Sequence, residues 1–420
     1  MILNENSILY WLWLQTVCGE GSVIPEILIS HFGSIDEVYK AEESDYEKVA
    51  GITARSVKKL AGKSLDKPRE ILAYCKNEGV GILTPDMTLY PKRLNRIPCK
   101  PAVLYYRGTM VDFDREVCIA EVGTRDMTEY GSRVAYTMAY DMARGGAVVV
   151  SGMAKGVDGM AHRGALDAGG YTVAVLGCGI DRAYPSEHVG LMNEIIKCGL
   201  VMTEFRPFTP PMGRNFPMRN RIVSGLSLGT LVIEAPKKSG ALITAETALK
   251  QGRDVFALPG KVGEITSEGS NTLIRNGAKM VTGATDILVE YQSLYPTKID
   301  LNKITAIKSR NFAPASYVAA EAPNYSEKRR ESAEKRASLS EKEITKPVKE
   351  AKEEKTYTLP PDIEGKQLEI LRLLMNEGEM TADAIAAKTE IAITDVLVEL
   401  TMLEIMGHIS AGPGGTYKLS

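Results

Sequence analysis

Two glycine-containing segments that follow apolar runs carry groups able to bind an anion. Gly123-Thr124-Arg125 comes directly after VCIAEV, and SGMAKG, with Ser151, Gly152 and Lys155, comes at the end of AVVVS. Glycine lets the backbone approach a ligand closely, and the amides and dipole of a following helix N-terminus attract phosphate. Arg125 and Lys155 add mobile positive charge. Because both segments follow strands that would be neighbours, we predict that they form a shared phosphate site.

A third candidate region, residues 205–238, combines positive charge with aromatic rings. Its basic residues are Arg206, Arg214, Arg219, Arg221, Lys237 and Lys238, against the single acid Glu234. Phe205, Phe208 and Phe216 alternate with the arginines, and such tracks suit single-stranded nucleic acid, whose unpaired bases stack on aromatic faces. Phe216 is the predicted stacking residue, whereas most of these phenylalanines fit a core. Ser239 and Gly240, at the start of a predicted helix, would offer further amides to phosphate.

Other reactive side chains are predicted to be structural. Asp158 and His162 are spaced to share a helix face, but no further metal ligand accompanies them. The six cysteines are scattered, without a CxxC pair, and are expected to be reduced thiols. We therefore predict no catalytic residue, no metal and no cofactor.

The elements that position these residues are predicted to form an α/β fold. Six β-prone apolar runs between residues 117 and 258 alternate with amphipathic stretches, which indicates a parallel sheet covered by helices on both faces. Residues 73–295 would form this Rossmann-like core. Residues 1–72 have the apolar spacing of short helices and would form a separate small helical domain.

Beyond the core the sequence changes twice. Residues 296–361 lose periodicity and include a run of alternating charges, which predicts a flexible linker. Residues 362–420 predict three helices and a hairpin, the pattern of a winged helix. Residues 363–420 hold four Lys or Arg against nine Asp or Glu, a balance that would repel phosphate. We expect this module to contact protein rather than duplex DNA.

The net charge of −2 excludes a uniformly basic nucleic-acid coat, so any phosphate affinity must be local. No run reaches the roughly 18 apolar residues of a membrane span, and the first residues lack the basic segment of a signal peptide. A cytoplasmic location is expected.

Six motifs together resemble the DprA (Smf) family. They are GTRDMTEYG, SGMAKGVDGMAHRGAL, GCGIDRAYPSEH, NFPMRNRIVSGLS, KSGALITAETALKQGRDVFALPG and GSNTLIRNGA, in family order across about residues 119–285. The resemblance implies an extended Rossmann-like domain, an N-terminal domain of sterile-alpha-motif or helix-hairpin-helix type, and a C-terminal winged helix. It also implies a homodimer that binds single-stranded DNA and loads the RecA recombinase in natural transformation and homologous recombination.

Carried over by motif, the DNA-contacting residues would be Arg125, Ser151, Lys155, Phe216, Arg219, Asn220 and Arg221. Two positions depart from the family pattern. Glu121 stands where an aliphatic residue is usual, and His188 stands where asparagine is usual.

Two other classes of function compete with this interpretation. GLSLGTLVIEA is similar to the PGGxGTxxE motif of nucleotide phosphoribohydrolases, with Glu234 as the potential catalytic carboxylate, but it lacks the paired glycines. A winged-helix transcription regulator is the second alternative, and the acidity of that module argues against it. A dinucleotide oxidoreductase is disfavoured because no GxGxxG opens the first helix of the core.

Overall fold

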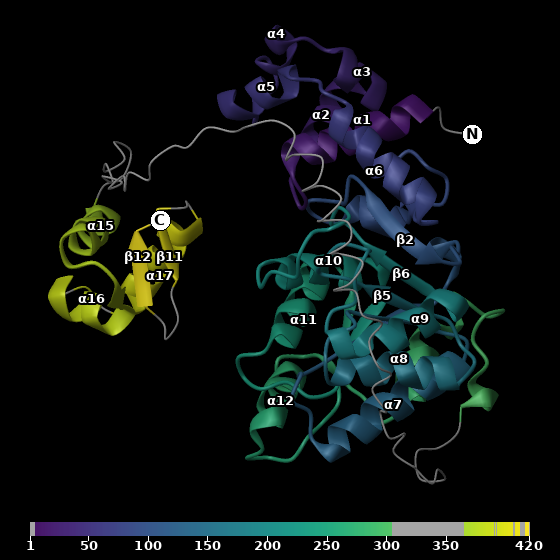
Figure 1. Ribbon diagram of the computed structural model, residues 1–420. Coiled ribbons are helices and arrows are strands. Elements are labelled where there is room, and N and C mark those ends of the chain that lie inside the picture. Colours follow the sequence, from purple (N-terminus) through teal and green to yellow (C-terminus); the bar gives the residue numbers. More distant parts are fainter. Residues whose placement is uncertain are drawn as a thin grey trace, which may run out of the picture. The chain divides into compact units, whose positions relative to one another are not determined.

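The computed structural model describes residues 5–304, 365–389, 391, 393–405, 408–411 and 416–419. The chain divides into two compact units between residues 328 and 329 (Figure 1). The larger unit contains the N-terminal helices and the central sheet, and the smaller unit contains the C-terminal module. Residues 305–361, most of the predicted linker, lie outside the described residues.

A nine-stranded sheet forms the centre of the larger unit, with the order β1-β2-β6-β5-β4-β3-β7-β8-β9. Its strands are β1 Gly81–Leu83, β2 Leu104–Gly108, β3 Cys118–Val122, β4 Val148–Ser151, β5 Thr172–Val175, β6 Leu200–Thr203, β7 Gly229–Val232, β8 Asp254–Ala257 and β9 Lys279–Met280. The strands from β6 to β9 pair in parallel. The predicted α/β class with a mostly parallel sheet is confirmed.

An antiparallel extension at one edge was not predicted. β2 pairs with β6 and β1 pairs with β2, both antiparallel. The short runs GIL and LYYRG are less buried than the inner strands and lack their continuous apolar character. Mixed sheets with such edge strands are common in this class of fold.

Helices cover both faces of the sheet (Figure 1). One face packs against α7 Glu129–Arg144, α8 Val157–Asp167, α9 Val189–Cys198 and α13 Ala284–Gln292. The other packs against α10 Asn215–Leu226, α11 Gly240–Lys250 and α12 Glu268–Arg275. Short 3-10 turns lie at η1 Lys92–Arg96, η2 Phe113–Arg115, η3 Ser186–His188, η4 Ile265–Ser267 and η5 Leu301–Lys303. None of the helices in the described ranges has the length and apolar character needed to cross a membrane.

The end of α7 shows that the core extends past its predicted boundary. The helix ends at Arg144, as the following glycines predicted, and Gly146 has φ +97°. A Cβ at Gly146 would lie 1.9 Å from the carbonyl oxygen of Lys298. Ile299 is buried, and Ile304 packs on the same apolar cluster. Residues 296–304 are therefore part of the packed core, and the prediction that the linker begins at residue 296 is wrong by these nine residues.

The N-terminal region is helical, but it shares its apolar core with the sheet. Its helices are α1 Glu5–Cys18, α2 Ile24–Phe32, α3 Ile35–Lys40, α4 Glu43–Tyr46, α5 Ala54–Ala61 and α6 Asp66–Asn77. Buried side chains of α1 and α6 belong to one cluster with Tyr105 of β2. Gln15 accepts a hydrogen bond from the Tyr105 hydroxyl and donates one to the Glu204 carbonyl, both at 2.7 Å. The boundary predicted at residue 72 falls inside α6.

The smaller unit is a winged helix, as predicted. It contains α15 Gly365–Glu377, α16 Ala382–Thr389 and α17 Ile393–Ile405, with a sheet of order β10-β12-β11. These strands are β10 Met380–Thr381, β11 Ile409–Ala411 and β12 Thr416–Leu419. On α17, Asp395 pairs with Lys366 at 2.7 Å and Glu399 accepts a hydrogen bond from Gln367. Two acids of the helix that would read DNA are thus directed at α15.

The cysteines are free thiols in the structure. Cys75, Cys118 and Cys178 are buried, and burial raises the pKa of each thiol to about 12. A thiol with so high a pKa is a poor nucleophile at neutral pH. These three residues act as small apolar side chains of the core.

Candidate nucleic-acid interface

The predicted motifs meet at the carboxyl edge of the parallel strands. The Thr124 amide donates to the Glu234 carbonyl at 2.8 Å, and the Val157 amide donates to the Thr124 carbonyl at 3.2 Å. A Cβ at Gly123 would lie 2.5 Å from Cγ2 of Val157. This glycine is therefore required for close packing of the β3 end against α8, and it positions the exposed Arg125 at the edge.

Arg125 lies over Phe216, which joins the first predicted motif to the third. The guanidinium carbon is 5.3 Å from the ring centroid of Phe216, and the Tyr184 ring lies 5.3 Å from the same centroid. Phe216 rests on Gly177, where a Cβ would lie 2.8 Å from its Cδ1. Tyr184 is 40% exposed. A planar cation and two aromatic rings are thereby gathered at one place, a combination that stacks on unpaired bases.

Tyr184 is a residue that the sequence analysis missed. It lies in GCGIDRAYPSEH, a segment noted only for its family resemblance. An aromatic residue in a polar loop was the available signal, but its value depended on contact with Phe216, 32 positions away. Only the fold brings these rings together.

Lys155 is presented by a loop that Asp158 holds in place. The Asp158 carboxylate accepts hydrogen bonds from the amides of Gly152 and Ala154, at 3.1 and 3.3 Å. The Lys155 side chain is 60% exposed and pairs with Glu187, which raises the pKa of the lysine. An exposed pair of this kind contributes little to stability, so the ammonium can exchange its partner for a phosphate.

His188 is the residue that brings Glu187 to this loop. Its Nδ1 lies 3.0 Å from the Met153 carbonyl oxygen, and its ring is mostly buried. Burial lowers the pKa of this imidazole. His188 thus makes a buried contact between the two loops.

Ser151, Gly152 and Arg219 do not fit their predicted role in contacting DNA. Ser151 is fully buried and its hydroxyl donates to the Glu121 carbonyl at 2.6 Å. Arg219 is 3% exposed and donates to the carbonyl oxygens of Gly152 and Val175. A Cβ at Gly152 would collide with this guanidinium. Arg219 ties the ends of β4 and β5 together, because a buried cation requires such partners.

Arg221 is likewise withdrawn from the surface. Its Nη2 lies 2.5 Å from Oε2 of Glu204, and the two side chains are 12% and 2% exposed. Burial raises the pKa of Glu204, and the guanidinium opposes that effect. Asn220 is half-buried and accepts a hydrogen bond from Nε of Arg219 at 3.1 Å. The structure thus corrects the prediction for Arg221 and leaves Asn220 only partly accessible.

The remaining predicted cations lie on the surface. Arg214 is exposed immediately before α10, and Lys237 and Lys238 are exposed before α11. Ser239 caps α11 by accepting the Ala241 amide at 3.2 Å, and Gly240 is exposed in its first turn. β7 is three strands from β5, or roughly 14 Å along the edge. A ligand that contacts both Phe216 and this helix must therefore be extended.

Glu234, the carboxylate of the hydrolase alternative, is held by α7. Its two oxygens accept hydrogen bonds from the amide and the hydroxyl of Thr128, at 2.9 and 2.6 Å. A Cβ at Gly131 would lie 2.3 Å from Oε2. The side chain is 4% exposed. This geometry caps the N-terminus of α7, where a negative charge is stabilised.

Two further ionisable groups lie beneath the site without reaching the surface. Glu121 is fully buried, and its carboxylate oxygens have no hydrogen-bond partner in the described part of the chain. Burial raises its pKa well above the ordinary value, and Asp158 adds to the effect. His162 has Nδ1 2.8 Å from Oγ1 of Thr172, and burial lowers its pKa to about 3. The structural interpretation of His162 is confirmed.

Comparison with known proteins identifies the family. Residues 81–292 match the family model of DNA recombination-mediator protein A, and residues 354–415 match that of the DprA winged helix domain. The chain is 32% identical to the protein Smf of Synechocystis, over 97% of this chain and 98% of the relative. The chain belongs to the DprA/Smf family. The family's domain order matches the two units described above.

DprA of Streptococcus pneumoniae agrees with this assignment in both sequence and structure. The DNA processing protein DprA of that organism is 40% identical over 48% of this chain and 71% of the relative. The X-ray structure of DprA from Streptococcus pneumoniae superposes with a TM-score of 0.59 at 32% identity, covering 69% of this chain and 99% of the other. The DprA fold therefore extends well beyond the segments that the motifs cover.

Proposed function

We propose that this chain binds single-stranded DNA at the carboxyl edge of its sheet. The observation that carries the proposal is the Arg125 guanidinium on the Phe216 ring, with Tyr184 beside it. In a duplex the base faces are already stacked, so aromatic faces of this kind select unpaired strands. Membership in a family described as DNA recombination mediators supports DNA as the ligand.

Five exposed cations would neutralise the backbone. They are Arg125, Lys155, Arg214, Lys237 and Lys238. With about −0.7 per single-strand phosphate contact, the logarithm of affinity should fall with the logarithm of salt at a slope of roughly −3.5. A complex insensitive to salt would contradict this arrangement.

The family resemblance extends the proposal to recombination. A strand held along this edge would be protected and passed to the RecA recombinase, in natural transformation or homologous recombination. A homodimer would place two such edges in one particle and increase affinity through effective concentration. The winged helix, with its acidic balance, would contact protein.

We propose a binding function without catalysis, in the cytoplasm. The rival hydrolase needs a carboxylate free to approach a sugar carbon, whereas both oxygens of Glu234 are engaged by Thr128. Binding through charge and stacking requires neither bond making nor a cofactor.

The test is fluorescence anisotropy of a labelled oligothymidine, with a duplex of equal length as competitor. The variant is Arg125→Ala with Lys155→Ala. Its matched control is Lys48→Ala with Arg115→Ala, which removes the same charge from two exposed residues away from the carboxyl edge. We expect strong single-strand preference in the full chain, retained by the control and lost by the variant.

Equal affinity for duplex and single strand, or unchanged binding by the variant, would overturn the proposed site. The recombinase step has its own measurement. The protein should accelerate RecA filament assembly on a strand already covered by a single-strand-binding protein, and the same variant should not.

A further inference from the structure

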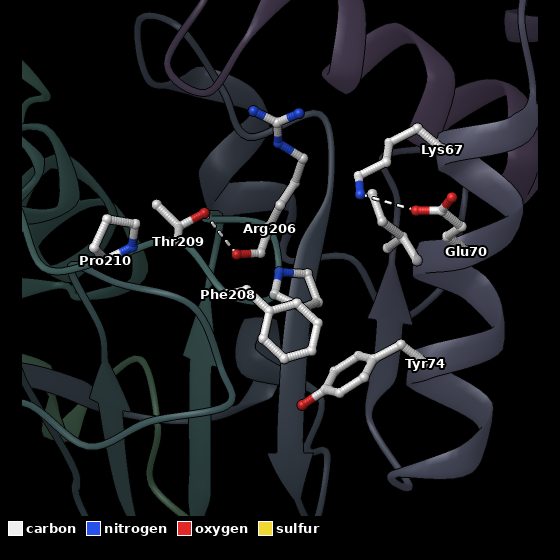
Figure 2. Close-up of a pocket in the computed structure, with 9 residues that line it drawn as sticks. Lys67, Glu70, Tyr74, Arg206, Phe208, Thr209 and Pro210 are labelled. Atoms are coloured by element: carbon white, nitrogen blue, oxygen red, sulfur yellow. Dashed lines mark hydrogen bonds and ion pairs between the residues drawn. The ribbon is translucent and has the colours of Figure 1, made fainter. Parts of the chain in front are cut away.

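A cavity of about 350 Å³ lies between α6 and the loop that follows β6. Its walls are Lys67, Glu70, Ile71, Tyr74, Arg206, Pro207, Phe208, Thr209 and Pro210. Figure 2 shows the ring of Tyr74, which comes from α6, next to the ring of Phe208, which comes from the loop. Their centroids are 4.8 Å apart at an interplanar angle of 63°. The two rings contact each other edge to face, and Phe208, which is 62% exposed, gives the cavity an aromatic surface on which a flat ligand can stack.

Phe208 lines this cavity with its backbone in an unfavourable, left-handed conformation. Its side chain is 62% exposed, and its φ is +69°, a region that residues other than glycine rarely adopt. The Phe208 amide donates to Oδ1 of Asp181 at 2.6 Å, and the Gly179 amide donates to the Thr209 carbonyl at 2.9 Å. These bonds impose the strained backbone. A bulky exposed ring held in this way points to a ligand contact.

The cavity adjoins the strand site through one short segment. Phe216 rests on Gly177, and the backbone around Phe208 is bonded to Gly179 and Asp181. Two residues of chain span at most about 7 Å. The Phe216 cluster and the Phe208 cavity are therefore close enough to be reached by one extended strand.

Polar groups at the cavity suit a nucleotide. Lys67 pairs with Glu70 at 2.9 Å, and both are more than half exposed, so the lysine can exchange its partner for phosphate. Arg206 is held by Glu20 at 2.8 Å. The Tyr74 hydroxyl is protonated at neutral pH and can donate to a base, and burial raises its pKa further, to about 12.

We propose that this cavity binds a base of the same DNA strand that lies on Phe216, stacked on Phe208 beside Tyr74. The inference rests on the proposed function and deepens it. It adds α6 of the N-terminal region to the DNA-binding surface. It also assigns a binding role to Tyr74 and Phe208, which lie outside the family motifs.

The test compares oligothymidines of about 4 and about 16 nucleotides, a range that spans one to several contacts. Variants of the full chain are Phe208→Ala and Phe208→Trp, with Leu294→Ala as the control for loss of an exposed apolar side chain. Trp11 and Trp13 are both buried and shielded from contact with DNA, so the quenching of the indole introduced by Phe208→Trp is measured as the difference from the unaltered chain.

We expect Phe208→Ala to weaken the long oligonucleotide about tenfold and the short one less than twofold. Phe208→Trp should retain affinity, and its fluorescence should be quenched by the long oligonucleotide. Unchanged binding of both lengths by Phe208→Ala would overturn the cavity site and leave the proposed function intact. Failure of the unaltered chain to bind either length would overturn both.

Discussion

The basic residues of the predicted motifs fall into two groups, one exposed to solvent and one buried in the protein. Arg125 and Lys155 are exposed at the carboxyl edge, whereas Arg219 and Arg221 are buried and bonded to backbone carbonyls or to Glu204. The exposed set can bind phosphate without disturbing the fold. The buried arginines stabilise the ends of the strands, and the exposed residues lie in the loops that follow those ends. The lesson is that a basic motif can contain both a ligand contact and its scaffold.

The largest effect should come from the scaffold. Arg219→Ala would leave the carbonyls of Gly152 and Val175 without a donor and Asp158 without its counter-charge, so we expect a loss of about 3–5 kcal/mol in the free energy of unfolding. Urea unfolding followed by tryptophan fluorescence measures it. Arg214→Ala, on the exposed side, should change stability by less than about 0.5 kcal/mol. If Arg219→Ala were fully stable but no longer bound DNA, Arg219 would be a DNA contact rather than a structural residue.

Arg125→Ala should affect binding alone. We expect affinity for oligothymidine to fall about tenfold, or about 1.4 kcal/mol, with an unchanged unfolding curve, because the guanidinium is exposed. Arg125→Lys keeps the charge and loses the planar group that lies on Phe216, so it should give an intermediate affinity. Affinity of Arg125→Lys equal to that of the unaltered chain would show that charge alone acts here.

Glu121 allows the interior to be tested through pH. Its pKa in the folded chain is raised, so the folded state holds the proton at pH values where the unfolded state has lost it. The stability that Glu121 contributes is present below its unfolded pKa of about 4.5 and is lost as pH rises. Glu121→Gln cannot ionise, so its stability relative to the unaltered chain should increase between pH 5 and pH 8.

The measurement is urea unfolding at both pH values. Glu246→Gln, an exposed carboxylate on α11, serves as the control and should show no such increase. A relative stability of Glu121→Gln that does not depend on pH would show that the Glu121 carboxyl ionises freely in the folded chain.

The smallest effect should come from the ion pair at the surface. Glu187→Gln removes the carboxylate that competes with phosphate for Lys155, so affinity for oligothymidine should rise by up to about threefold at low salt and less at high salt. Anisotropy titrations at two salt concentrations measure it. Glu290→Gln, on α13, breaks a comparable ion pair with Lys279 of β9 and should leave affinity unchanged. Weaker binding by Glu187→Gln would mean that the pair positions Lys155.

The sequence was most informative where a local pattern repeats. The inner strands are buried on both faces, so their continuous apolar runs were recognisable without the fold. The glycines after α7 marked its end at Arg144. The edge strands β1 and β2 were missed because their pairing with β6 depends on partners far along the chain.

The candidate site was predicted in outline and corrected in detail. Residue type and spacing brought Arg125, Lys155 and Phe216 to one edge of the sheet, because the ends of parallel strands meet there. Spacing could not separate Arg214, exposed just before α10, from Arg219, buried within that helix, since accessibility depends on which face packs against the sheet. Tyr184 and Phe208 were left out because their roles depend on contacts with rings distant in sequence.

By itself the sequence determined the α/β class, the winged helix and the family, because strand periodicity, helix ends and motif order are local properties of the chain. The tertiary structure decided which cations reach solvent, which carboxylates are held as structural groups, and where the helical N-terminal region joins the sheet. Those outcomes depend on burial, which is set by side chains that approach one another only when the chain is folded.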